Sequence, residues 1–128
     1  MTFAEITYWL YIIAMGAVII GHFAFAWKQW CDWPGLCQDL TDLRGSEIEK
    51  TAFLGRSIAS YNASIGIGLS LSSWLDEWPQ ALVQGAVLAL ICATAAVGAS
   101  GTRGNKILLL RFTPGVLALI LLVVVQIL

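Results

Sequence analysis

The segment ILLLRFTPGVLALILLVVVQIL, residues 107–128, decides the fold class of this chain, because nearly all of it is apolar. An α-helix needs about 20 such residues to cross the roughly 30 Å hydrocarbon core of a bilayer. Three more apolar runs of similar length precede it, at residues 8–27, 52–74 and 79–99. The sequence therefore predicts an all-α integral membrane protein, a single antiparallel four-helix bundle that occupies residues 1–128.

The overall composition also favours a membrane environment. Of the 128 residues, 59% are hydrophobic and 12% are charged, and the formal net charge is −1. Soluble domains average about 25% charged residues. We therefore expect membrane lipids as partners, with no nucleic-acid partner and no room for a soluble domain.

The basic residues predict the orientation of the bundle. All seven fall in or just inside the first and third connections: Lys28, Arg44, Lys50, Arg56, Arg103, Lys106 and Arg111. The N-terminal tail and the second connection contain no Lys or Arg. Because cytoplasmic loops are enriched in basic residues, both basic connections are predicted to be cytoplasmic, with both termini on the non-cytoplasmic side.

The cytoplasmic connection, residues 28–51, is long enough to have structure of its own. Three leucines recur in it at helical spacing: Leu36, Leu40 and Leu43. This pattern predicts a short amphipathic helix at the membrane surface. Ser46 and Glu49 have the spacing of a capping box, as do Thr2 and Glu5 at the start of the first span.

The last span is predicted to be irregular. Asn105 is the expected N-cap of this helix. Pro114 lies one to two turns into this helix, where it frees a carbonyl about four residues earlier. A kink is therefore expected near this point.

The second span is unusually polar, with RSIASYNASIG at residues 56–66. Five residues share one stripe of the helix: Ser57, Ser60, Tyr61, Ser64 and Gly68. Asn62 and Gly66 lie on a different side. Since lipid satisfies no hydrogen bonds, polar groups on two faces predict that this helix is central and contacts protein on both.

Polar groups from three spans have similar predicted depths. His22 enters from the first span, Arg56 from the second and Arg111 from the last. We expect them to meet in a pocket that opens toward the cytoplasmic leaflet and binds a lipid or small lipophilic molecule. The predicted ligand-binding residues are Arg56, Ser57, Ser60, Tyr61, Asn62 and Arg111. If the protein is an enzyme, an isomerase with His22 as its general acid/base is the simplest scheme.

A purely structural interpretation competes with this pocket. Arg56 and Arg111 are close enough to the interface to extend to lipid phosphates. His22 is typical of an interhelical hydrogen-bond partner, and membrane serines often bond their own backbone. Asn62 has several hydrogen bonds to satisfy and no short path to water. The alternatives are thus a structural or assembly subunit, or a small homo-oligomeric transporter or channel.

The third span carries small residues at four-residue spacing: Ala81, Gly85, Ala89 and Ala93. Such a ridge lets a second helix approach closely. The neighbouring helix belongs either to the same chain or to another copy, and we expect a homo-oligomer formed through this ridge.

Metal and cofactor signals are weak. Cys31 and Cys37 have no histidine nearby, so no metal site is predicted. A haem needs only one axial ligand, which His22 provides, but no other feature indicates one. The sequence therefore does not identify a cofactor.

Two motifs resemble those of the domain of unknown function 1304 family, a group of small bacterial membrane proteins. They are SYNASIGIGL, residues 60–69, and KILLLRFTPGVLALILLVV, residues 106–124. The family has a Tyr-Asn-Gly motif in its second helix and a basic-Ile-Leu-Leu run that leads to a proline in its fourth. The matching positions are Tyr61, Asn62, Lys106 and Pro114. The resemblance implies a four-helix fold in the bacterial inner membrane and no particular activity.

The chain also departs from that pattern. The family has Asn-Gln where this chain has Ser57-Ile58, and Gln where it has Arg111. The family's first helix carries Glu beside a His, whereas Gly21 precedes His22 here. If those groups form a polar site in the family, this chain has rebuilt it, with Arg56 and Arg111 as the sources of charge.

Overall fold

The computed structural model describes residues 1–100, 102 and 106–128, and the regular elements in this part of the chain are all helical. The bounds are α1 Phe3–Cys31, α2 Trp33–Leu40, α3 Ser46–Lys50, α4 Ala52–Ser72, α5 Glu77–Ser100, the π-helical segment η1 Leu108–Phe112, and α6 Thr113–Ile127. Each predicted apolar run thus coincides with a long helix, and η1 and α6 together form the last one.

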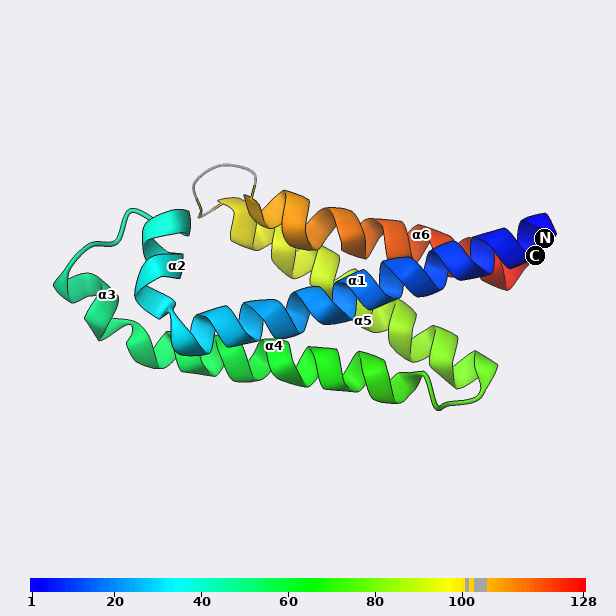
Figure 1. The fold of residues 1–128 in the computed structure, drawn as a ribbon, viewed down its shortest axis with the longest axis horizontal. Coiled ribbons are helices and arrows are strands. Elements are labelled where there is room, and N and C mark those ends of the chain that lie inside the picture. Colours follow the sequence, from blue (N-terminus) through cyan, green and yellow to red (C-terminus); the bar gives the residue numbers. More distant parts are fainter. Residues whose placement is uncertain (101, 103–105) are drawn as a thin grey trace.

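The long helices pack side by side (Figure 1). α1 lies between α4 and α6, while α5 packs against α6, η1 and α4. Both termini lie at one end of the molecule, and α2 and α3 lie at the other (Figure 1). The prediction that α4 is the central helix is wrong, because α1 has that position.

Within the described residues, three helices are long and apolar enough to cross a membrane: α1, α5, and η1 with α6. At most 33% of the most apolar stretch of each is buried inside the protein. Large apolar side chains such as Ile20 (69% exposed) and Val97 (75% exposed) cover the outside. A surface of this kind requires an apolar solvent, so the chain is a membrane protein. α4 is less apolar because it carries Arg56, Asn62 and several serines.

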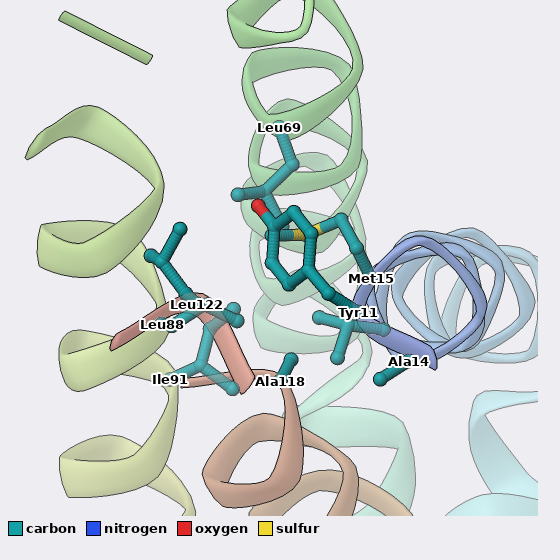
Figure 2. Packing of buried hydrophobic residues seen from close by; sticks show 9 residues of the cluster. Tyr11, Ala14, Met15, Leu69, Leu88, Ile91, Ala118 and Leu122 are labelled. Atoms are coloured by element: carbon teal, nitrogen blue, oxygen red, sulfur yellow. The ribbon is translucent and has the colours of Figure 1, made fainter. Parts of the chain in front are cut away.

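The core lies in the half of the bundle near the termini. Figure 2 shows how α1 contributes Tyr11, Ala14 and Met15 to it. The other helices contribute Leu69 from α4, Leu88 and Ile91 from α5, and Ala118 and Leu122 from α6. The cluster therefore joins all the long helices around α1.

The two capping predictions have different outcomes. The Thr2 box is confirmed: Thr2 Oγ1 accepts from the Glu5 amide at 3.2 Å, and Glu5 Oε2 accepts from the Thr2 amide at 2.7 Å. The Ser46 box is wrong, since Ser46 lies inside α3 and Gly45 is the N-cap, with no side-chain cap. Gly45 has a φ of +54°, a conformation that favours glycine.

The expected surface helix is present as α2, although Leu43 lies beyond its end at Leu40. Trp33 fixes α2 to α4. Its Nε1 donates to Thr51 Oγ1 at 3.2 Å, and its ring covers Gly55, where an added Cβ would lie 2.5 Å from a ring carbon. Gly55 thus permits this close approach.

The irregularity predicted at Pro114 takes the form of a π-helical turn. The Thr113 amide bonds the Leu108 carbonyl, five residues back, and Thr113 Oγ1 donates to the same carbonyl at 3.0 Å. In a regular α-helix the Pro114 ring would clash with the carbonyl four residues earlier. The wider turn accommodates the proline, and it contains Arg111. The expected cap Asn105 lies outside the described residues.

The small-residue ridge of α5 is divided between two environments. Ala81 and Gly85 are half-buried, and a Cβ at Gly85 would lie 3.6 Å from Leu122 of α6. Ala89 and Ala93 are exposed. The first half of the ridge therefore packs within the chain.

Candidate functional site

Asn62 lies at the centre of a buried polar cluster. Its side chain is 0% exposed. Asn62 Nδ2 donates to Gln29 Oε1 at 2.7 Å, and Arg111 Nη2 donates to Asn62 Oδ1 at 3.3 Å. The cluster thus links α4, α1 and η1.

The direction of these bonds is fixed by the arginine. A guanidinium group donates and never accepts, so Arg111 requires the oxygen of Asn62. The Asn62 amide then turns its NH₂ toward Gln29, which must present its own oxygen. The chain of donors runs from Arg111 through Asn62 to Gln29.

Helical spacing and the π-helical turn bring these groups together. Gln29 follows His22 by two turns of α1, and both side chains face the interior at 7% and 3% exposure. Arg111 comes from the widened turn η1, which changes the angular register of the helix at this point. Sequence analysis missed Gln29. Its spacing of two helical turns from His22, which puts both residues on one face of the helix, could have indicated it.

His22 adjoins this cluster. Its Nδ1 lies 2.8 Å from the Val18 carbonyl and therefore carries the proton that is shared with it. Its Nε2 is buried and has no hydrogen-bond partner in the described part of the chain, and the same holds for Arg111 Nε. His22 and Arg111 are close enough to interact electrostatically. The arginine also lies over the Phe25 ring, 5.9 Å from its centroid.

The remaining predicted ligand-binding residues do not join them. Arg56, Ser57, Ser60 and Tyr61 are all exposed on the outer face of α4. The Ser60 hydroxyl donates to its own helix, to the Arg56 carbonyl at 3.0 Å. The structure thus brings His22, Asn62 and Arg111 together and places the α4 stripe elsewhere.

A groove runs beside this cluster, between α1 and the start of the last helix. It consists of two adjoining hollows of about 250 Å³ and about 100 Å³ that share Phe25, Lys28 and Leu110. Gly21 and Ala24 continue it toward the middle of α1. At the other end lie Lys106, Asp39 and the side chains of α2. We call this the inner groove. Phe25 joins it to Arg111, because it lines the groove and also contacts the guanidinium.

The charged end of the inner groove is weakly paired. Lys28 Nζ lies 3.4 Å from Asp39 Oδ2, and both side chains are about half exposed. Exposed ion pairs of this kind contribute about 0–1 kcal/mol. Lys106 is also exposed. An anionic group that enters the groove can therefore compete with Asp39 for Lys28 and can also approach Lys106.

The sequence matches the family described as "Protein of unknown function (DUF1304)" over residues 16–123, which is most of the chain. The chain belongs to the DUF1304 family. No curated protein and no solved structure matches it.

The family motifs coincide with the cluster in this DUF1304 protein. Asn62 is its centre, and Pro114 follows the widened turn that carries Arg111.

The DUF1304 chain has a second buried polar network, near the termini, which sequence analysis did not identify. The Tyr11 hydroxyl donates to Gln84 Oε1, and Gln84 Nε2 donates to Ser72 Oγ at 3.0 Å. Ser72 Oγ in turn donates to the Leu69 carbonyl at 2.7 Å. A lone Gln84 within an apolar helix was the signal for this network.

The described residues of this family member offer no set of metal ligands. Within the described residues, no three His, Cys, Asp or Glu side chains gather as a protein metal site requires. Cys37 is buried, and burial raises the pKa of its thiol, which disfavours the thiolate that a metal needs.

Proposed function

We propose that this DUF1304 protein binds a lipophilic anion, such as an anionic lipid or a fatty acid, in the inner groove. The observation that carries the proposal is the shape of that groove, which is apolar along Gly21, Ala24 and Leu110 and basic at Lys28 and Lys106. An acyl chain suits the first part and an anionic head suits the second. Two lysines face one aspartate there, so the local charge favours an anion.

Arg111 supports the same ligand from behind the groove wall. Its guanidinium is held by Asn62 and by the Phe25 ring, and its Nε has no partner among the described residues. A cation held at this depth attracts negative charge into the groove. Asn62 and Gln29 then act as positioning residues, because they orient Arg111.

The orientation belongs to the same proposal. Six of the seven basic residues lie in described segments, all within or close to α2, α3 or the helix ends that adjoin them or the third connection: Lys28, Arg44, Lys50, Arg56, Lys106 and Arg111. The positive-inside rule makes this end cytoplasmic, with all four long helices crossing the bacterial inner membrane and both termini outside. The inner groove then opens at the cytoplasmic leaflet.

We propose binding and not isomerisation as the function. A general base must reach the proton that it abstracts, within about 2.6–3.2 Å or through one water. His22 is 3% exposed, and it is not among the residues that line the inner groove. The groove therefore supports a binding role more directly than a catalytic one.

The test uses the whole protein in nanodiscs that contain a zwitterionic lipid and a minor fraction of phosphatidylglycerol, followed by native mass spectrometry. Wild-type protein should retain phosphatidylglycerol, and the variant Lys28→Gln/Lys106→Gln should lose most of it. Lys50→Gln is the matched control, because Lys50 is an exposed lysine of α3 at the same end and lies outside the groove. Equal retention by all three proteins would refute the proposal.

A second candidate function, assembly of a membrane complex, is favoured by the outer face of α4. Ser57, Ser60 and Ser64 are exposed there, and because the Ser60 and Ser64 hydroxyls bond their own helix, these small side chains leave room for a second helix to approach. We propose that a second copy of the chain covers this face. We place the interface on this face instead of on the α5 ridge, because Ala81 and Gly85 of the ridge are half-buried and Gly85 lies against Leu122 of α6.

A further inference from the structure

The end of the bundle near the termini holds a cavity of about 360 Å³ that has no place in the proposed function. It lies between α1, α5 and α6. Ala81, Leu122 and Val125 supply its apolar wall, and Tyr8, Glu77, Gln80 and Gln126 surround it with polar groups. Tyr11 and Gln84 also line it, and both are buried, at 3% and 1% exposure. We call it the outer cavity.

The buried network beneath the outer cavity determines which hydrogen bonds remain for a ligand. Ser72 gives its proton to the Leu69 carbonyl, so its oxygen must accept from the Gln84 NH₂. This turns Gln84 Oε1 toward Tyr11, so the Tyr11 hydroxyl donates its proton to Gln84 Oε1. Tyr11 Oη has only lone pairs left to offer.

The rim of the cavity has the same character. Gln80 Nε2 donates to Gln84 Oε1 at 3.4 Å, which leaves Gln80 Oε1 to accept. Glu77 provides a carboxylate, and it is the one charged side chain among the described residues that line the cavity. Tyr8 adds an aromatic face, half exposed at 48%. The outer cavity therefore presents a carboxylate, the free lone pairs of Tyr11 Oη and Gln80 Oε1, and an aromatic ring, beside the Gln126 amide, which can donate or accept.

We propose that the outer cavity binds a primary ammonium group, either of a small free amine or of an ethanolamine lipid headgroup. An ammonium carries one positive charge and three N–H donors. Glu77 neutralises the charge, and Tyr11 Oη and Gln80 Oε1 accept from the remaining N–H groups. The Tyr8 ring contributes a cation–π contact. A phosphate or carboxylate ligand would instead be repelled by the Glu77 carboxylate.

The test measures binding to the full-length protein in two arms. In the first, isothermal titration calorimetry in detergent uses ethanolamine, with tetramethylammonium as the comparison that keeps the charge but has no N–H donor. In the second, native mass spectrometry from nanodiscs compares retention of phosphatidylethanolamine with that of phosphatidylcholine. Binding in the first arm identifies a free amine, and retention in the second arm alone identifies a lipid headgroup.

The variant Glu77→Gln should weaken binding about tenfold or more in whichever arm is positive, because a charge-assisted hydrogen bond is lost. Asp76→Asn is the matched control, since Asp76 is the neighbouring carboxylate but does not line the cavity. The proposal would be overturned if neither ethanolamine nor phosphatidylethanolamine bound to the protein. It would also be overturned if Glu77→Gln bound the ligand as well as wild type. Neither result depends on the inner groove.

Discussion

At the scale of single residues, Asn62 shows how one amide can organise a membrane protein. It accepts from a cation on one helix and donates to an amide on another, so it joins α1, α4 and η1 in a single direction. Gln29 and Arg111 are joined to each other only through Asn62 in these hydrogen bonds. This explains why a fully buried polar residue is tolerated: its hydrogen bonds replace those that water would supply.

We predict that Asn62→Ala lowers the free energy of unfolding by about 1–3 kcal/mol, because it leaves Gln29 Oε1 and the Arg111 guanidinium without their partner. Unfolding of the purified protein in mixed micelles with increasing SDS measures this loss. Ser60→Ala is the control on the same helix, one face away. The Ser60 hydroxyl is exposed and bonds only its own backbone, so we expect a change within about 0.5 kcal/mol. Equal stability of the two variants would contradict the role given to Asn62.

At the scale of elements, α4 has two faces with opposite roles. One face is buried against α1 and contains Ala59, Asn62 and Gly66. The other carries Ser60 and Ser64, whose hydroxyls bond the carbonyls four residues earlier, at 3.0 Å and 2.9 Å. Small side chains with satisfied hydroxyls form a smooth surface that allows a second helix to approach closely.

This surface predicts where two copies of the chain meet. In a Cys31→Ser background, Ser64→Cys should form a disulfide-linked dimer in native membranes under mild oxidation, because copies related by a two-fold axis bring equivalent positions together. Ala93→Cys tests the exposed half of the α5 ridge in the same way, and we expect it to stay monomeric. A dimer through Ala93 and none through Ser64 would place the interface on α5 instead. SDS gels without reducing agent read both outcomes.

At the scale of the whole molecule, the sequence predicted helix positions far better than helix faces. Hydropathy alone located the long helices, because about 20 apolar residues have few other uses. The sequence also identified Asn62, since a buried amide in an apolar helix needs hydrogen-bond partners on whichever face it lies. Arg56 was assigned to the same pocket from its depth alone. Depth does not specify direction, and the α1–α4 packing turned Arg56 outward. Arg111 points inward because of a π-helical turn that Pro114 indicated only as a kink.

The cysteines offer a test of the proposed orientation of the whole molecule. Cys31 is exposed at the α2 end of α1, whereas Cys37 and Cys92 are buried. A membrane-impermeant maleimide should therefore label Cys31 in inverted vesicles and not in intact cells, since only inverted vesicles expose the cytoplasmic side. Labelling in cells and not in inverted vesicles would reverse the proposed orientation.

The control is Cys31→Ser, in which the label should be lost from folded protein at neutral pH. Burial raises the pKa of the Cys37 thiol, so its thiolate, the reactive form, appears only at higher pH. Denaturation in SDS should restore labelling of Cys37 and Cys92, because unfolding removes the burial that protects them.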